Sequence, residues 1–181
     1  MISIVFFTLV FGVIELARLM YVYNTLQEVT RRAAVAAVKV FPGDAAGLAN
    51  VKRDAVFDTP TGELPLAPPV TNNHVRIDYL ALTRDNSGAL TMTEIPTSAL
   101  PTCPGQNRAI CLNNPNAENC IRFVRVRICD PVNAATCDRG TSASMFPLAG
   151  LRPMLHKATT IAVAESLGYQ PGTPPCAPVA P

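Results

Sequence analysis

The first 41 residues form a long stretch without proline, and they constrain the fold more than any other part of the 181-residue chain. An uncharged apolar run extends from Ile2 to Ile14, and an amphipathic helical pattern follows it up to Phe41. A single helix over this stretch would be about 60 Å long, about twice the hydrocarbon thickness of a bilayer. We therefore predict one helix that begins in a membrane and ends outside it.

Two charged residues fall within the predicted membrane span. The apolar run covers residues 2–14 only, whereas a spanning helix needs about 20 residues, so the span has to extend to Tyr23. Glu15 and Arg18 then lie in its outer half, on one helical face, where they can pair. One interpretation is an interfacial ion pair in which Arg18 reaches the lipid headgroups. The other is a contact to a neighbouring subunit, because charges inside a membrane usually have partners.

A row of apolar residues continues beyond the span with alternating spacings of three and four, which places them along one side of a helix. The row comprises Leu19, Val22, Leu26, Val29, Ala33, Ala36 and Val40. Charged residues such as Arg31 and Lys39 fall off this row. We favour packing of the row on the chain's own sheet over a purely intermolecular role. Packing on the sheet and packing against another subunit can also both occur, at different positions along the helix.

The residues after the long helix predict a short second helix and a loop. Pro42 and Gly43 end the first helix, because proline cannot continue it and glycine suits the turn that follows. Asp44 is a suitable N-terminal cap for a helix over residues 45–57. Residues 58–70 contain four prolines and are predicted as a loop.

Alternation of apolar and polar residues predicts a small antiparallel sheet. The predicted strands are His74–Leu82, Ala89–Ile95, Ile121–Cys129 and Lys157–Glu165, with a turn at residues 85–88. Residues 96–120 are predicted as an irregular loop held by disulfides, and the proline-rich tail at 169–181 as extended chain. Arg122, Arg125 and Arg127 fit a solvated strand face better than a site for an anionic surface.

Six cysteines, an even number beside a membrane segment, indicate disulfides in a compartment outside the cytoplasm. They are Cys103, Cys111, Cys120, Cys129, Cys137 and Cys176. Zinc is the weaker interpretation, because structural zinc sites usually need closely spaced ligand pairs and the chain has no Cys-x-x-Cys or paired histidines. Among the possible pairings we expect a local Cys129–Cys137 bridge and a bridge that ties Cys176 back to the domain.

Charge and motifs exclude several classes of function. The net charge is +2, and no block of like charge gives the electrostatic footprint of nucleic-acid binding. His74 and His156 stand without a neighbouring nucleophile or carboxylate motif and are interpreted as polar surface residues. The sequence contains no nucleophile elbow, phosphate-binding glycine loop or histidine metal pair. We therefore predict no catalytic residue, no metal, no cofactor and no nucleic-acid partner.

The N-terminal segment FFTLVFGVIELARLMYVYNTLQEVTRRAA resembles the start of TadE-like minor pilins of the tight-adherence (Flp, type IVc) pilus. In that family an apolar stretch runs into Phe-Gly-x-x-Glu, a small residue and arginine, and then into an aromatic-rich turn of a polar helix. The matching positions are Phe11, Gly12, Glu15, Ala17, Arg18, Tyr21, Tyr23, Asn24 and Leu26. A Phe-Pro-Leu loop at 146–148 and a final strand ending in Glu165 also resemble the C-terminal part of members of this family.

The resemblance implies an α+β fold, with a long pilin-like N-terminal helix packed on a small antiparallel β-sheet and with disulfide-braced loops. Residues 1–23 would be the transmembrane half of the helix, 24–41 its extracytoplasmic half, 42–168 the globular head and 169–181 the proline-rich tail. The chain would cross the inner membrane once, with its C-terminal domain in the periplasm or, as part of a pilus, at the cell surface.

The resemblance also implies a function without catalysis. The chain would be a minor pilin or pseudopilin that primes the assembly of a pilus or stands at its tip, and it would act by helix–helix packing. Its partners would be major and minor pilins, the inner-membrane assembly platform and the membrane. The residues expected to set subunit packing and register are Glu15, Arg18, Leu19, Val22, Leu26 and Val29. Two alternatives stay open: a membrane-anchored extracytoplasmic binding or adhesion module outside any filament, and a periplasmic thiol oxidoreductase.

The start of the chain departs from the family pattern. Members of the family are similar to other pilins in having a basic leader, a prepilin-peptidase site and a glutamate soon after the cut, whereas position 5 here is Val5. We expect the family's true N-terminus to lie upstream of Met1. Arg31, Arg32 and Lys39 follow the span, so the positive-inside rule favours a cytoplasmic C-terminus. We follow the cysteines instead, because a missing basic leader removes the charges that the rule counts.

Overall fold

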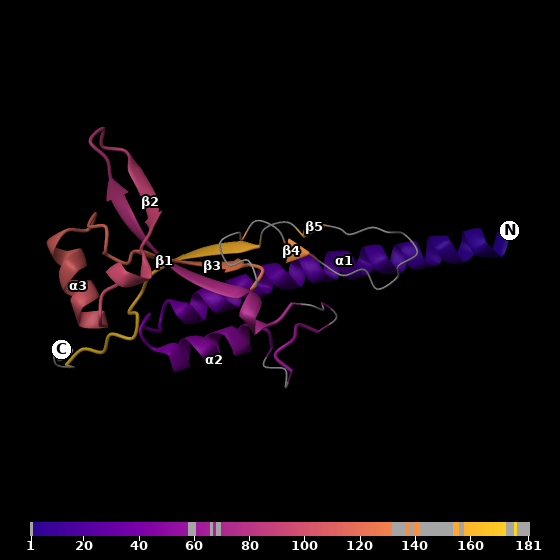
Figure 1. The fold of residues 1–181 in the computed structure, drawn as a ribbon, viewed down its shortest axis with the longest axis horizontal. Helices are drawn as coiled ribbons and strands as arrows, with labels where there is room; N and C mark the ends of the chain where they lie inside the picture. The colour runs from indigo at the N-terminus through magenta and orange to yellow at the C-terminus, as the bar shows by residue number, and fades with distance from the viewer. Residues whose placement is uncertain are drawn as a thin grey trace.

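A computed structural model describes residues 2–57, 61–65, 67, 70–131, 137, 140–141, 154–155, 158–172 and 176. Its α-helices are α1 (Ile2–Ala37), α2 (Ala45–Ala55) and α3 (Pro104–Asn113), and its short 3-10 helices are η1 (Asn72–His74) and η2 (Thr97–Ala99). Its strands are β1 (Val75–Arg84), β2 (Leu90–Glu94), β3 (Phe123–Ile128), β4 (Gly140–Thr141), β5 (Met154–Leu155) and β6 (Thr159–Val163). Figure 1 shows the N-terminus of α1 at one end of an elongated molecule and α3 at the other.

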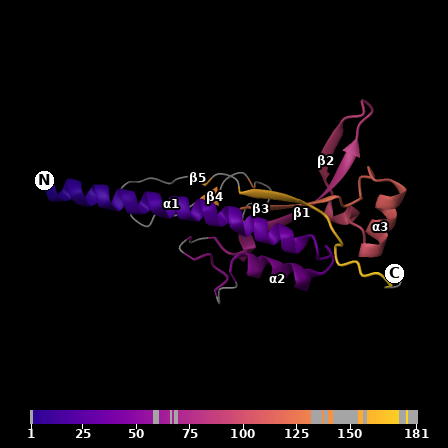
Figure 2. The same ribbon diagram turned by 180° about the vertical axis from the view of Figure 1, so that it is seen from behind.

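The head is built on a four-stranded antiparallel sheet in the order β2-β1-β3-β6. Register places Tyr79 opposite Val124 and Ile77 opposite Val126, so alternate residues of β1 and β3 share one face. The C-terminal half of α1 packs on this face and, with α2 beside it (Figure 2), forms the core. The predicted α+β fold, a long N-terminal helix on a small antiparallel sheet, is confirmed.

The structure corrects the prediction of an irregular loop over residues 96–120, because α3 lies within that range. Cys103 precedes the helix, and its sulfur accepts a hydrogen bond from the Gln106 amide at 3.4 Å. Pro104 is the first helical residue, a position where the missing N–H is not needed. A segment rich in proline and asparagine therefore forms a helix with an unusual cysteine cap.

All six cysteines are paired in the structure. The pairs are Cys103–Cys176, Cys111–Cys120 and Cys129–Cys137, with Cα atoms 6.0, 5.1 and 4.2 Å apart. The expected local bridge and the expected tie of the C-terminal tail to the domain are both present. The remaining pair, Cys111–Cys120, links the end region of α3 to the residues before β3 and holds this helix against the sheet.

Asp44 caps α2 as predicted, although the helix ends at Ala55, two residues before the predicted end. Its carboxylate accepts a hydrogen bond from the Gly47 amide at 2.9 Å and so satisfies one of the free N–H groups of the first turn. Val51 and Ala55 on the other side of the helix are buried in the core. The cap fixes where α2 starts and thereby which of its residues face α1.

We expect Asp44→Ala to lower the free energy of unfolding by about 1 kcal/mol, because the Gly47 amide loses its acceptor. Asp54→Ala is the matched control, since Asp54 is an exposed carboxylate near the C-terminal end of the same helix. Urea unfolding followed by circular dichroism measures both changes. Equal losses in the two variants would contradict the role of Asp44 as a cap.

His74 holds the turn that leads into β1. Its Nδ1 atom accepts a hydrogen bond from the Thr71 amide at 3.0 Å, and its side chain is half-buried. Burial lowers the pKa of His74, although the nearby charge of Asp130 acts in the opposite direction. The interpretation of His74 as a simple surface residue is therefore incomplete, because its neutral form is part of the turn.

Protonation of His74 should weaken the fold at acid pH. The folded chain binds the imidazole proton of His74 less tightly than the unfolded chain does. The neutral ring therefore contributes its full stabilisation at pH values above the pKa of the unfolded chain, which is about 6.5. That stability is lost as the pH falls from there through the lowered pKa of the folded state. Urea midpoints of the native chain and of His74→Asn, compared over this range, measure the effect. Identical pH dependence in both would rule out a contribution from His74.

Candidate assembly surface on helix α1

Helix α1 carries most of its exposed apolar residues on the half that precedes Val22. These side chains are 37–69% exposed and comprise Ile4, Val5, Phe6, Phe7, Leu9, Val10, Val13, Ile14, Leu16 and Met20. Among the described residues, Val22 is the first of the helix to be fully buried. Over Ser3–Ala37 the helix is long and apolar enough to cross a membrane. It is therefore a candidate membrane anchor.

The change from exposed to buried coincides with the depth of a bilayer. Residues 2–21 of an α-helix span about 30 Å, the thickness of the hydrocarbon core. Tyr21 and Tyr23 follow at this level and are each 42% exposed. Tyrosine is enriched where the hydrocarbon meets the headgroups. Val22, the first fully buried residue of α1 among the described residues, thus lies where a membrane-spanning helix would leave the lipid.

The apolar row of α1 packs in the chain's own core. Val22, Leu26 and Val29 are 0–2% exposed, and they belong to the same buried cluster as Val124 and Val126 of β3. These three residues are therefore not available to another subunit, and the prediction that they set subunit packing is corrected to a role in the core. The favoured interpretation of the row was packing on the chain's own sheet, and the structure shows this packing for Val22, Leu26 and Val29.

A hydrogen bond between the buried Thr30 and the half-buried Thr160 adds a polar link between α1 and the sheet. The Thr30 and Thr160 hydroxyl oxygens lie 2.9 Å apart, and Thr30 has no exposed surface. The Thr30 hydroxyl donates to the Gln27 carbonyl at 2.9 Å and can at the same time accept from the Thr160 hydroxyl. Sequence reasoning missed this contact, because Thr30 falls off the apolar row and its partner lies 130 residues away.

Glu15 and Arg18 form an ion pair on the apolar half of the helix. The Arg18 Nη1 and Glu15 Oε1 atoms are 3.0 Å apart, and their side chains are 8% and 15% exposed, respectively. The second carboxylate oxygen of Glu15 is buried and has no hydrogen-bond partner among the described residues. Leu19, next along this face, is half-buried. Of the six predicted packing and register residues, these three lie on the part of α1 that precedes the core.

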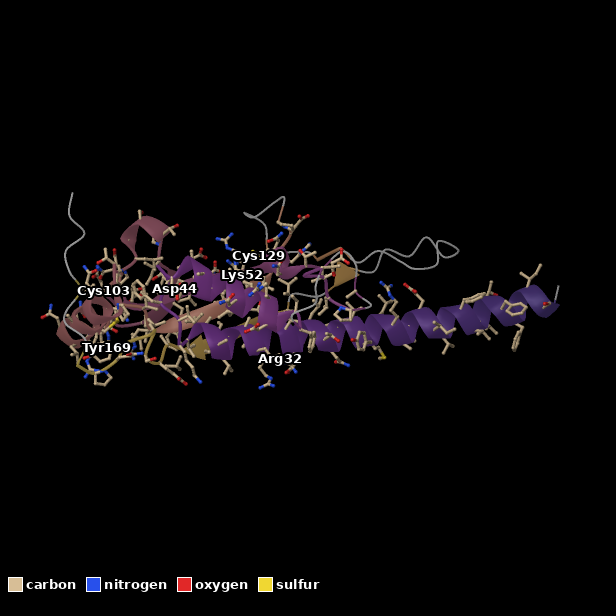
Figure 3. All side chains as sticks on the ribbon, turned by 90° about the horizontal axis from the view of Figure 1, so that it is seen from below. Arg32, Asp44, Lys52, Cys103, Cys129 and Tyr169 are labelled. Carbon is tan, nitrogen blue, oxygen red and sulfur yellow. A yellow bond between two sulfur atoms is a disulfide. The ribbon has the colours of Figure 1, made fainter. Side chains whose placement is uncertain are left out.

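A polar cluster covers the outside of the C-terminal half of α1. Glu28 accepts from Arg31 Nε and from Arg32 Nε, both at 2.8 Å. The Arg32 guanidinium also lies 4.6 Å from the centroid of the Phe57 ring, and the side chain lies on the outer side of the helix (Figure 3). Val35 is 50% exposed on the same half. This half therefore presents a mainly charged surface to its surroundings.

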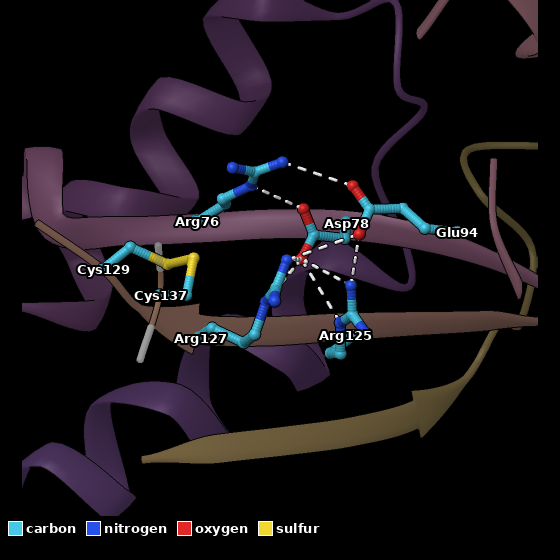
Figure 4. Close-up of a disulfide and its surroundings, with 7 residues drawn as sticks. All are labelled: Arg76, Asp78, Glu94, Arg125, Arg127, Cys129 and Cys137. Atoms are coloured by element: carbon cyan, nitrogen blue, oxygen red, sulfur yellow. Dashed lines mark hydrogen bonds and ion pairs between the residues drawn. A yellow bond between two sulfur atoms is a disulfide. The ribbon is translucent and has the colours of Figure 1, made fainter. Parts of the chain in front are cut away.

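The sheet face turned away from α1 carries a second ionic cluster, shown in Figure 4. Asp78, whose side chain is 3% exposed, accepts from Arg76 Nε and Arg127 Nε at 2.8 Å each and from Arg125. Glu94 of β2 pairs with the same three arginines. The arginines of β3 were predicted as a solvated face, whereas the structure shows them half-buried and joined to acidic partners. The cluster ties β2, β1 and β3 together.

The family model of TadE-like proteins matches residues 1–35. Over this stretch the chain is similar to TadE-like proteins. The match covers α1 almost to its end at Ala37 and stops before the head. It confirms the resemblance found in the sequence of this segment. Comparison with curated proteins found no match, and comparison with solved structures found none either.

The TadE-like resemblance of the C-terminal part is only partly visible in the structure. The predicted final strand at 157–165 corresponds to β6 (Thr159–Val163), which pairs with β3. Lys157, His156 and the Phe-Pro-Leu loop at 146–148 lie outside the described residues. The exposed apolar half of α1, together with the Glu15–Arg18 pair, is therefore the candidate functional surface.

Proposed function

We propose that this chain is a membrane-anchored, pilin-like subunit that takes part in assembling a tight-adherence-type pilus, with a priming or tip role. The inner membrane would store the apolar half of α1, and the disulfide-braced head would stand in the periplasm. The observation that carries the proposal is the division of one TadE-like helix into an exposed apolar half and a half buried in the head.

Assembly would exchange lipid for protein around the apolar half of α1. Phe6, Phe7 and Phe11 already form a short aromatic ladder along it, with ring centroids 5.6 and 6.2 Å apart. In the membrane, lipid chains cover these rings, and in a filament the helices of neighbouring subunits would cover them. Burial of apolar surface stabilises the filament once the segment leaves lipid, and no bond is made or broken.

The Glu15–Arg18 pair would set the register between neighbouring helices. Arg18 and Glu15 lie on the apolar half of the helix and pair with each other at 3.0 Å. A correctly placed neighbour would leave this pair closed, whereas a shifted neighbour that separated it would leave the charges unpaired at a cost of several kcal/mol. The pair therefore favours one alignment of the helices over the others.

We expect Arg18→Ala to reduce the number of pili several-fold while the protein still accumulates in the membrane, because Glu15 loses the donor at 3.0 Å. Thr8→Ala is the control, since the Thr8 hydroxyl bonds only within its own helix, to the Ile4 and Val5 carbonyls. Electron microscopy counts the pili, and immunoblots of membrane fractions measure the protein. Normal piliation in Arg18→Ala would remove the register role and leave the family assignment standing.

Deletion of the gene and complementation in trans test the proposed function itself. A deletion strain should make few or no pili, and the native gene should restore them. Pili of normal number and length in the deletion strain would contradict a role in assembly. If such a strain also attached poorly to surfaces, the result would favour the membrane-anchored binding module.

A further inference from the structure

A cavity of about 460 Å³ opens at the end of the head farthest from the N-terminus of α1. It lies between α3 and the segment that follows β6, and Figure 3 shows Tyr169 and Cys103 at this end of the molecule. The volume is within the range of about 300–1,000 Å³ that is usual for ligand pockets. A site here would face away from the membrane whenever α1 is anchored.

The walls of this cavity are fixed by covalent and buried polar links. The Cys111–Cys120 bridge joins α3 to the residues before β3, and Cys103–Cys176 joins the start of α3 to the tail. The Asn107 side chain, buried behind the wall, accepts a hydrogen bond from the Ile121 amide at 2.9 Å. A pocket whose walls are held in this way loses little conformational freedom when a ligand binds.

The polar groups at the mouth of the cavity favour an anion. The Arg108 guanidinium lies 5.0 Å from the centroid of the Tyr169 ring and has no acidic partner among the described residues. Arg122 also lines the cavity, and Nη1 of its guanidinium donates to the Pro115 carbonyl at 3.3 Å, which leaves its other donors available. Planar guanidinium groups bind carboxylates through paired hydrogen bonds.

Glu165 narrows the class of ligand further. Its exposed carboxylate lines the same cavity as the two arginines, and its negative charge disfavours a densely charged polyanion. The same oxygens accept hydrogen bonds from hydroxyl groups. The ring of Tyr169 and the side chain of Ile121 add apolar wall beside these polar groups. The cavity therefore matches a ligand with an isolated carboxylate, several hydroxyl donors and an apolar face.

We propose that this cavity binds a carboxylate-bearing saccharide. Arg108, with Arg122 beside it, would hold the acid group, Glu165 would accept from the sugar hydroxyls, and Tyr169 would pack against the C–H face of the ring. The inference does not depend on the pilus role, because it concerns the pole of the head opposite α1. Failure of either proposal would leave the other standing.

Isothermal titration calorimetry of the full chain in detergent micelles tests the proposal with a disaccharide that carries one carboxylate, a glucuronic acid joined to a glucose, as the probe. Its methyl ester has nearly the same shape without the charge and should not bind. Arg108→Gln should weaken binding of the acid about tenfold or more, the usual loss for a hydrogen-bonded charge. Arg84→Gln, at the exposed end of β1, is the matched control and should bind like the native chain.

Three results would overturn the proposal. The first is no saturable binding of the acidic disaccharide by the folded chain. The second is equal affinity for the acid and its methyl ester, or equal affinity in Arg108→Gln and Arg84→Gln. The third is equal or tighter binding of a short peptide with a single carboxylate, which would assign the cavity to acidic peptides.

Discussion

Val29→Asp is expected to unfold the head, whereas Val35→Asp on the same helix should leave it folded. Val29 has no exposed surface and lies in the cluster between α1 and the sheet, while Val35 is 50% exposed. An unpaired carboxylate in such a core costs several kcal/mol, and the total stability of a domain is only about 5–15 kcal/mol. An aspartate at position 35 stays in contact with water and carries little of this cost.

Near-ultraviolet circular dichroism and protease resistance in detergent measure the outcome, because the chain has four tyrosines and no tryptophan for fluorescence. Val29→Asp should lose both the signal and the resistance, and Val35→Asp should keep them. A folded head in Val29→Asp would show that the apolar row of α1 does not form the core. The pair of variants thus distinguishes packing within the chain from packing between chains.

Asp78→Ala should be the second most damaging change, with a loss of about 3 kcal/mol in the free energy of unfolding. Asp78 is the buried acceptor for Arg76, Arg125 and Arg127, and its removal leaves three guanidinium groups crowded on one face of the sheet. The loss is at the lower end of the range for a broken buried pair, because the arginines are 22–37% exposed and stay partly solvated.

Glu94→Ala is the matched control for Asp78→Ala. Glu94 pairs with the same arginines, but its side chain is 41% exposed, so its removal should cost less than about 1 kcal/mol. Urea unfolding of both variants at low and high salt measures the difference. Equal losses in the two variants would show that burial of Asp78 does not control the energy of the cluster.

Sequence periodicity was enough to predict α1 and the main strands, because their patterns depend on which side of each element is buried. The 3–4 spacing from Leu19 to Val29 follows the buried side of α1, and the alternation in β1 and β3 follows the two faces of the sheet. The local Cys129–Cys137 bridge could also be predicted, because the two cysteines are only eight residues apart in the sequence.

Features that depend on register or on distant pairing were not predictable. Asp78 meets Arg125 and Arg127 across 47 and 49 residues, and only the alignment of β1 with β3 brings them together. Helix α3 was missed because cysteine is not among the residues that usually cap helices and its surroundings have the composition of a loop. The distal cavity needs the Cys103–Cys176 bridge, which joins segments 73 residues apart.

The central claim is that α1 leaves the membrane where the head begins to cover it. Single cysteines introduced by Leu9→Cys, Val13→Cys, Asn24→Cys and Val35→Cys test it, because the six native cysteines are paired and do not react with maleimide. In spheroplasts, an impermeant maleimide should label positions 24 and 35 and should label 9 and 13 only after detergent is added. Labelling of positions 9 and 13 in intact spheroplasts, or of 24 and 35 only after lysis, would contradict the account.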